Sequence, residues 1–416
     1  MRRRIDVKGA LLAVAIASPA MATGGGFDGI YTFGDSLSDQ GNLFVATGFG
    51  VPRADYYSDG RFTNGENWVD VLAGRLDVLS ERSLYGGNNF AFGGTRTDYN
   101  TVELNAVKPP PVNHLTNQGN VFPRLPNGQP LFPWTLNAQQ DAFKSLGVND
   151  PGALYVVFSG SNDLVDITLM VAFGLLDPVD DVPVWFGDVL VGINGAIEAM
   201  VDAGAQDILV PNIPNLGVVP GFATVGLGPL ATLLTEQYNA DLQTMLDSWE
   251  HRVNIIPFDT FSLTTAVVSN PPAFGFTNAT APCYSGFVGV EEGEVINVCS
   301  NPDEHVFWDR EHPTAAFHAY MAEQFMATIV LDILDDLSQQ VSGLNSNNGV
   351  KSSLTDKLDV TIKTLTDGNS SNDQTAVRKL GDFISIVEAK QGKKIMEEDA
   401  LSLIKRAEQV IALLES

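Results

Sequence analysis

The segment 30–42, IYTFGDSLSDQGN, decides the fold. It opens with a short apolar run, typical of a strand buried in a sheet, and the run ends at Gly34. Ser36 follows two residues after this glycine, which suits a tight turn from a strand into a helix. Such a turn exposes the serine hydroxyl and directs backbone N–H groups toward the same point. A helix N-cap uses the same residue types, so this segment alone leaves a purely structural role for Ser36 open.

Apolar strands alternate with helical patterns through the body of the chain. Strands are expected at 154–158 (LYVVF), 207–211 (DILVP) and 253–258 (VNIIPF), and helices at 68–76, 184–203, 229–250 and from Pro313 to about Leu337. This alternation predicts an α/β fold with a parallel sheet covered on both faces. The proline-rich insertion 108–134 is expected to be an ordered loop over the domain, because its prolines exclude a helix.

Three further segments carry polar residues or glycines where a site can form. The segment 89–95 (NFAFGGT) places paired glycines after an apolar run, so a backbone N–H can approach a substrate closely. The segment 158–163 (FSGSND) puts Asn162 at the carboxyl end of a predicted parallel strand. The segment 308–314 (WDREHPT) sets Asp309 and His312 three residues apart, before a helix-starting proline. Singly, these segments equally fit a strand-ending turn, a helix-capping asparagine and a surface histidine.

Together the four segments resemble the GDSL, or SGNH, lipase/esterase family, in which serine, glycine, asparagine and an Asp–His pair occur in this order. The resemblance covers about residues 27–337, and the segment 61–65 (RFTNG) followed by Trp68 resembles the lipase-like branch. It implies a flavodoxin-like three-layer α/β/α sandwich with a parallel sheet that hydrolyses esters or thioesters without a cofactor. No metal site is expected, because the 2 cysteines and 5 histidines are not spaced as ligands.

The resemblance implies a catalytic role for each matched residue. Ser36 is expected to attack the ester carbonyl, while His312 moves the proton and Asp309 orients the imidazole. The backbone N–H groups of Ser36 and Gly94 and the side chain of Asn162 are expected to bind the oxyanion. The adjacent Gly93 is the alternative donor to Gly94.

The expected substrate is a small-molecule or lipid ester. Apolar residues around 173–186 and 222–234 could line an acyl groove, although core packing explains them as well. A carbohydrate O-acetyl esterase is the alternative enzyme, and a non-catalytic binding protein on a hydrolase fold is the alternative of another class. The net charge of −26 lies almost entirely in residues 23–340, which argues against nucleic acid and anionic membranes as partners. The oligomeric state is left open.

The N-terminus is identified as a secretory signal peptide over residues 1–22. A basic stretch, Arg2–Arg4, precedes the apolar run Ala10–Ala17, and Ala20–Ala22 forms a small-x-small cleavage site. The apolar run is too short to cross a bilayer, and no later run is long enough for a stable span. A secreted or periplasmic protein is therefore expected, with a buried N-terminal helix as the alternative.

The 2 cysteines, Cys283 and Cys299, fit an exported protein. In an oxidising compartment an even number of cysteines predicts a disulfide, which here would close a local glycine-containing loop. Two free buried thiols are the alternative.

The C-terminal part of the chain differs in composition from the body. Residues 23–340 are expected to form the hydrolase domain, and 341–350 (VSGLNSNNGV) a polar linker. Residues 351–416 carry three apolar stripes at helical spacing, the third beginning at Leu401, which predicts a small all-α module. The segment 383–414 resembles the helical module called FIMAH, which is appended to various secreted bacterial proteins and implies no catalysis.

Overall fold

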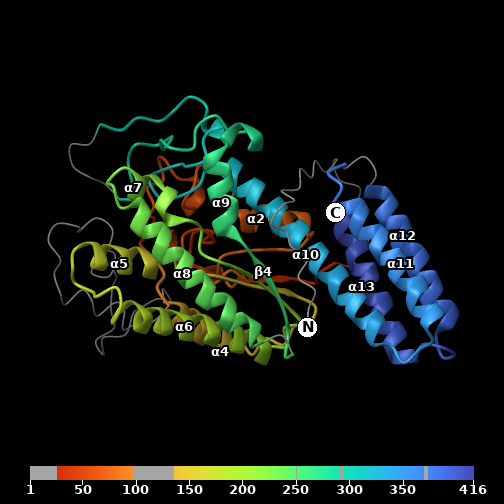
Figure 1. The fold of residues 1–416 in the computed structure, drawn as a ribbon. Coiled ribbons are helices and arrows are strands. Elements are labelled where there is room, and N and C mark those ends of the chain that lie inside the picture. The colour runs from red at the N-terminus through yellow and green to blue at the C-terminus, as the bar shows by residue number, and fades with distance from the viewer. Residues whose placement is uncertain (1–25, 98–134, 250, 290–294, 370–372) are drawn as a thin grey trace. The chain divides into compact units, whose positions relative to one another are not determined.

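A computed structural model describes residues 26–97, 135–249, 251–289, 295–369 and 373–416 (Figure 1). The expected signal peptide and the proline-rich insertion lie outside the described residues. The chain divides into a larger compact unit, residues 29–73 and 79–322, and a smaller one formed mainly by residues 323–416.

A parallel sheet forms the centre of the larger unit. Its strands lie in the order β1-β2-β3-β4, with bounds Ile30–Gly34, Leu154–Phe158, Asp207–Pro211 and Asn254–Phe258. Every residue of β2 and β3 is buried, which explains why these strands are almost continuous apolar runs in the sequence. The sequence predicts all four strands to within one residue at either end.

The segment 88–92 runs parallel to β1 on the side away from β2. The Thr32 N–H donates to Asn88 O (3.1 Å), the Phe90 N–H to Thr32 O (2.7 Å) and the Phe92 N–H to Gly34 O (3.1 Å). Counted as a strand, this segment gives the spatial order 2-1-3-4-5, which is the flavodoxin-like order. It leads the chain to the same end of the sheet at which β1 delivers Ser36.

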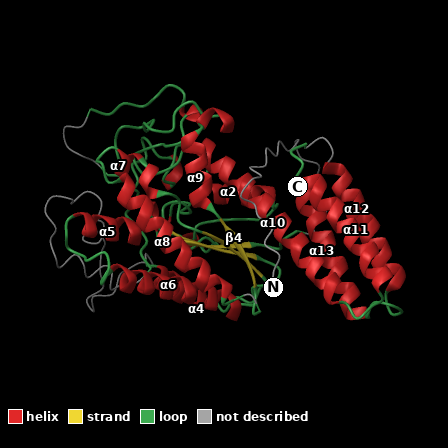
Figure 2. Cartoon of the chain, viewed as in Figure 1, coloured by secondary structure: helices red, strands yellow, loops and turns green. Residues whose placement is uncertain are grey.

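Helices cover both faces of the sheet, which confirms the expected α/β/α sandwich (Figure 2). On one side lie α4 (Leu136–Ser145), α6 (Val182–Asp202) and α8 (Gly228–Asp247). On the other lie α2 (Trp68–Arg75) and α9 (Thr260–Ser269). Among its described residues, this unit also contains the α-helices α1 (Asn42–Ala46), α5 (Ser161–Ala172), α7 (Pro220–Ala223) and the start of α10 (Ala315–Gly343).

Among the described residues, α6 is the one helix long and apolar enough to cross a membrane by length and composition. Its side chains Val189, Ile193, Ile197 and Met200 are buried in the core cluster of the sheet. This packing accounts for its apolar composition, because a helix buried in a domain core carries the same residue types.

The smaller unit is helical, as expected. α11 (Asn348–Leu365), α12 (Asp373–Lys390) and α13 (Glu397–Glu415) pack against one another in chain order. The C-terminal part of α10 joins α13 through the Arg406–Asp336 ion pair (3.3 Å) and through a hydrogen bond from Ser402 to Gln340 (3.1 Å). The buried apolar side chains of α11 to α13 include Leu354, Leu358, Leu380, Phe383, Val387, Leu403 and Val410.

The junction between α10 and α11 is more compact than the sequence predicts. α10 continues to Gly343 and α11 begins at Asn348, so much of the expected linker is helical. Val341, Leu344 and Val350 are all buried. These apolar residues lie several positions apart among polar ones, which makes them inconspicuous in the sequence.

The buried face of α13 also differs from the prediction. Leu401, expected to begin the third apolar stripe, is 57% exposed, whereas Ala400 and Leu403 are buried. Leu413, near the C-terminal end of the helix, is also buried. The apolar residues of this helix occupy neighbouring positions, so its periodicity alone does not select between the two faces.

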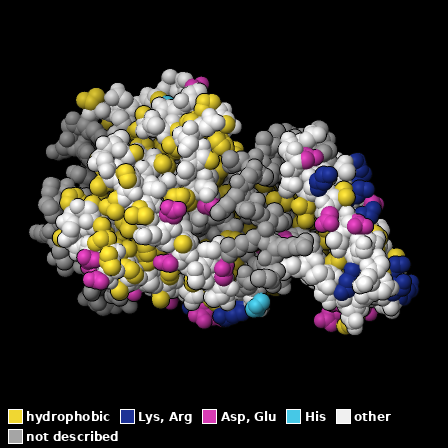
Figure 3. Space-filling view, viewed as in Figure 1, with side chains coloured by type: hydrophobic (Ala, Val, Ile, Leu, Met, Phe, Trp, Pro, Cys, Tyr) yellow, Lys and Arg dark blue, Asp and Glu magenta, His cyan; other side chains and the backbone are white. Residues whose placement is uncertain are grey.

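Charged side chains are unevenly distributed on the face drawn in Figure 3. Most of the lysine and arginine side chains visible there belong to the C-terminal helices, whereas acidic side chains are spread over the larger unit. This distribution agrees with a nearly balanced C-terminal segment and a strongly acidic body.

Candidate active site

Ser36 lies in the turn that directly follows β1. At the end of that strand, a Cβ at Gly34 would collide with the carbonyl oxygen of Phe158 on β2, so this close approach of two strands requires glycine. The Leu37 N–H donates to Asp35 Oδ1 (3.0 Å) and closes the turn. The Ser36 side chain faces a pocket, and its Oγ lies 2.9 Å from His312 Nε2.

His312 is held between Ser36 and Asp309. Its Nδ1 lies 2.8 Å from Asp309 Oδ2, and its backbone N–H donates to Asp309 Oδ1 (2.7 Å). The imidazole packs against Phe62 and Phe287, with ring centroids 5.2 and 6.1 Å away. Burial alone would lower the pKa of His312, but the charge of Asp309 and its hydrogen bond raise that pKa above its ordinary value. The arrangement therefore stabilises a proton on the imidazole.

Asp309 is fully buried and has a second partner besides the histidine. The Tyr57 hydroxyl donates to Asp309 Oδ2 (2.6 Å). Burial opposes ionisation, but the charge of His312 and hydrogen bonds from His312 and Tyr57 hold the pKa of Asp309 below its ordinary value. Burial and the neighbouring carboxylate raise the pKa of Tyr57, so its hydroxyl remains a donor. Sequence reasoning missed Tyr57, which has no local signal and lies 252 positions from Asp309.

Two of the three expected oxyanion donors lie at the pocket beside Ser36. Ser36 and Asn162, in the first turn of α5, both line the pocket. Gly94 follows segment 88–92 and has a positive φ of 77°, but it is not among the residues that line the pocket. The Gly93 N–H donates to Asp39 Oδ2 (2.8 Å), whereas the Gly94 N–H has no partner among the described residues. This difference favours Gly94 as the donor.

Asp39 joins the serine turn to the glycine segment. Its carboxylate accepts the N–H groups of Gly41 (2.7 Å), Asn42 (2.6 Å) and Leu43 (3.1 Å) at the start of α1, in addition to that of Gly93. Burial raises the pKa of Asp39 to about 6, which leaves it ionised at neutral pH. The two segments are therefore fixed relative to each other by one carboxylate.

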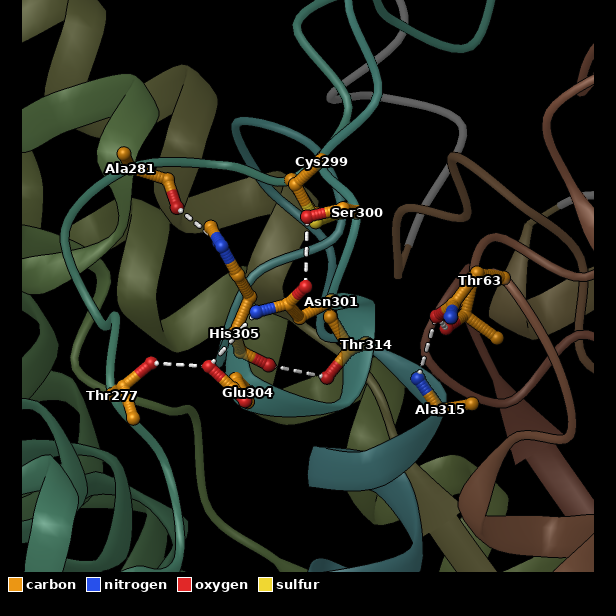
Figure 4. Close-up of a disulfide and its surroundings, with 12 residues drawn as sticks. Thr63, Thr277, Ala281, Cys299, Ser300, Asn301, Glu304, His305, Thr314 and Ala315 are labelled. Atoms are coloured by element: carbon orange, nitrogen blue, oxygen red, sulfur yellow. Dashed lines mark hydrogen bonds between the residues drawn. A yellow bond between two sulfur atoms is a disulfide. The ribbon is translucent and has the colours of Figure 1, made fainter.

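The disulfide drawn in Figure 4 lies close in the chain to the segment that carries Asp309 and His312. It joins Cys283 to Cys299, as the sequence predicts. The Cys283 N–H donates to Phe307 O (3.0 Å), so the bridge lies beside the chain that leads into Asp309. The described residues between α9 and α10 have little regular structure, so a covalent link can contribute to the order of this part of the chain.

The segment RFTN supports the other side of the same region. The Thr63 hydroxyl donates to Pro313 O (2.9 Å), and Asn64 Oδ1 accepts the Ala315 N–H at the start of α10 (2.8 Å; Figure 4). Phe62 supplies one of the two aromatic contacts to His312. A segment that the sequence marks only by family resemblance thus holds the histidine in place.

The pocket beside Ser36 is largely apolar. Its apolar lining includes Leu37, Val165, Leu216, Val219, Phe222, Phe317 and Met321. Of the apolar residues expected to form an acyl groove, Phe222 lines this pocket, whereas Phe173 is 47% exposed and Phe186 is buried in the core. Glu311 adds a carboxyl group whose pKa burial raises to about 7. No described group of His, Cys, Asp and Glu side chains could hold a metal ion.

Comparisons with known proteins connect this geometry to a family. The GDSL-like Lipase/Acylhydrolase family matches residues 30–325. A GDSL esterase/lipase of Arabidopsis thaliana is 25% identical over 376 residues, which cover 81% of this chain and 97% of that protein. The phosphatidylcholine-sterol acyltransferase of Aeromonas hydrophila is 23% identical over 347 residues, covering 74% and 92%. The thermolabile hemolysin of Vibrio parahaemolyticus is 24% identical over 307 residues, covering 71% and 62%. The resemblance of 383–414 to the FIMAH module is not confirmed.

Proposed function

The chain belongs to the GDSL-like lipase/acylhydrolase family, and we propose that it is a secreted serine hydrolase that cleaves lipid acyl esters through an acyl-enzyme on Ser36. Family membership makes it a carboxylic ester hydrolase. The observation that supports the covalent mechanism is the chain of short contacts from Ser36 Oγ through the His312 ring to Asp309, at 2.9 and 2.8 Å.

In acylation, Ser36 Oγ attacks the ester carbonyl carbon while His312 Nε2 accepts the hydroxyl proton. Asp309 holds the ring in the tautomer whose Nε2 is free and stabilises the imidazolium that forms. The carbonyl oxygen becomes an oxyanion and accepts hydrogen bonds from the expected donors on Ser36, Gly94 and Asn162. One such donor typically lowers the barrier by about 3–4 kcal/mol.

The tetrahedral intermediate then collapses. The bond to the leaving alcohol breaks, and that alcohol takes the proton from His312, which leaves the acyl group on Ser36 Oγ. Water enters, gives a proton to His312 and attacks the acyl carbon; a second collapse releases the carboxylic acid and returns the proton to Ser36. Apart from the water and the substrate, every group in this proposed cycle belongs to the chain, so the mechanism requires no cofactor.

Two observations support a lipid acyl ester as the substrate. The pocket beside Ser36 is lined mainly by aliphatic and aromatic side chains, which suit an acyl chain better than a sugar. One relative bears a name that refers to phosphatidylcholine, which is a lipid acyl ester.

Secretion is supported by two independent features of the chain. Residues 1–22 have the composition of a signal peptide, and the Cys283–Cys299 disulfide suits an oxidising compartment. Fractionation of the native host culture, followed by N-terminal sequencing of the protein found outside the cytoplasm, tests both the location and the cleavage after Ala22.

The nucleophile is tested by Ser36→Ala. Turnover of a chromogenic acetate ester and of a long-chain ester should fall by more than about 1,000-fold, because the base and the oxyanion donors cannot replace the missing hydroxyl. Rapid quenching of the wild-type enzyme should trap an acyl group on the peptide that contains Ser36, detected by mass spectrometry.

Ser38→Ala is the matched control. Ser38 is buried two residues further along the same turn, so its substitution changes the same segment without touching His312. It should retain turnover within about threefold. If Ser36→Ala kept activity within tenfold of wild type, or if the acyl group were found on another residue, the assignment of the nucleophile would be wrong.

A further inference from the structure

A buried ion pair links the loop after Gly94 to helix α5. The Arg96 and Asp166 residues are only 8% and 6% exposed. The guanidinium is bidentate, with Nε 2.5 Å from Asp166 Oδ2 and Nη2 3.0 Å from Asp166 Oδ1. Its third nitrogen, Nη1, donates to Gly94 O (3.0 Å). One side chain therefore holds both a helix and the backbone of a proposed oxyanion donor.

The helix held in this way carries the other non-serine donor. Asn162 and Asp166 are four residues apart on α5, so they lie on the same face of that helix. Asp163, between them, is completely buried and accepts the Thr97 N–H at 3.2 Å and the Thr97 hydroxyl at 3.1 Å. Two successive residues of the loop are thus tied to the first turns of the helix that presents Asn162.

Stability alone is a weak reason for such an arrangement. Burying a guanidinium and a carboxylate removes both from water, and their attraction often only balances that cost. What a guanidinium provides that an ammonium does not is a rigid, planar set of donors with fixed directions. Here the guanidinium donates both to Asp166 on α5 and to the Gly94 carbonyl, which lie about 70 positions apart in the sequence.

We propose that Arg96 is a positioning residue that aligns the Gly94 N–H with the Asn162 side chain, so that both donors address the same developing oxyanion. This role rests on the proposed function, since it needs an oxyanion at that point. Arg96 itself contacts neither Ser36 nor His312 through any described hydrogen bond and acts through the two donors. Their alignment matters because an error of about 1 Å in catalytic geometry can cost about 100-fold in rate.

Arg96→Lys is the informative variant. Lysine keeps the positive charge near Asp166 but cannot also hold Gly94 O with a fixed, forked geometry. We expect kcat to fall by about 10- to 100-fold while KM stays within about threefold, because the lost alignment acts on the transition state rather than on substrate binding. Asp166→Asn, which weakens the same pair from the other side, should lower kcat in the same direction and keeps the test usable if Arg96→Lys folds poorly.

Arg82→Lys serves as the control for loss of a buried arginine. Arg82 is 7% exposed and pairs with Asp59 (2.6 Å), but it lies before segment 88–92 and away from α5 in the chain. Tm is recorded for all variants, and kinetics are measured well below the lowest Tm. Arg82→Lys should keep kcat within about threefold whatever its Tm.

A double-mutant cycle with Asn162→Ala separates positioning from general structural support. Arg96→Lys should cost at least threefold less in the Asn162→Ala background than in wild type, because one of the two aligned donors is already missing. A kcat for Arg96→Lys within twofold of wild type, or losses that simply multiply, would overturn the positioning role. Failure of the proposed function would show separately, as activity that survives Ser36→Ala.

Discussion

His312 depends on its immediate neighbours for both its position and its basicity. Phe62 and Phe287 pack against the ring. Asp309 accepts hydrogen bonds from both the backbone N–H and the Nδ1 of His312. The charge of Asp309 outweighs the effect of burial and raises the pKa of His312. A protonated imidazole cannot accept the Ser36 proton, so activity should be lost as the pH falls through this raised pKa. In wild type the acidic limb should therefore lie above about 6.5, the ordinary histidine value.

The same reasoning predicts the effect of Asp309→Asn on pH dependence. Loss of the negative charge removes the largest influence that raises the pKa of His312, so the acidic limb of kcat/KM should move to lower pH. The maximal rate should also fall by about 10,000-fold, because the ring loses the partner that fixes its tautomer. A pH–rate profile measured with a highly active ester checks both effects.

Tyr57→Phe is the companion variant, because it removes a hydrogen bond to Asp309 without removing the negative charge of Asp309. The acidic limb should then stay at or above its wild-type position, with a modest loss of rate. An acidic limb that stayed in place in Asp309→Asn would contradict the electrostatic account of His312.

In its described residues, the connection between α9 and α10 is the least regular part of the chain that carries functional residues. It delivers Asp309 and His312 through short bridges and turns rather than through a strand. The Cys283–Cys299 bridge, which spans 16 positions, limits the freedom of this connection in the unfolded chain. Its hydrogen bond to Phe307 extends that constraint to the chain leading into Asp309.

Removal of the bridge should therefore affect stability first. The double variant Cys283→Ala/Cys299→Ala should lose about 3 kcal/mol of unfolding free energy, the value expected for a loop of this length. Urea denaturation of both proteins measures the difference, and activity at low temperature should persist in the variant. Non-reduced peptide mapping of the wild type should show the linked pair two hydrogens lighter than the reduced form. Thiols that label freely in the native wild-type protein would contradict the bridge.

At the scale of the whole molecule, the hydrolase residues and the C-terminal helices belong to different compact units. Ser36, Asp309 and His312 all lie in the larger unit, and so do the expected oxyanion donors. The helices α11 to α13 have their own buried side chains, which favours a module that folds largely by itself. The residues of α10 belong to both units, so a truncation within this helix removes more of the smaller unit than a truncation after Gly343 does.

Truncation tests whether the module contributes to turnover. A chain ending at Gly343, where α10 ends, and a chain ending at Gln340 should both hydrolyse a small soluble ester within a few-fold of the full-length rate. Assays on short- and long-chain esters at one temperature decide the matter: a change of tenfold or more with either substrate would show that the module contributes to the site.

Local patterns in the sequence were sufficient for the strands, the large helices and the four polar segments. Buried parallel strands are continuous apolar runs, and the residues after Phe33 and Phe158 lie at the carboxyl ends of such runs. The meeting of these ends at one edge follows from the parallel sheet, so the sequence pattern is enough to predict that Ser36 and Asn162 lie near each other. The roles assigned to them came from family resemblance and stay predictions.

Only the tertiary structure decided which distant residues support the site. Segment 88–92 lies along β1 through three backbone hydrogen bonds, a pairing that its own short apolar run does not predict. The contacts of Tyr57 with Asp309, of Asp39 with Gly93 and of Arg96 with Asp166 join positions far apart in the chain. The physical reason is that the periodicity of apolar residues in a sequence indicates only which side of a helix or strand is buried. The partner of a buried polar group is instead chosen by whichever segments the packed sheet brings within about 3 Å.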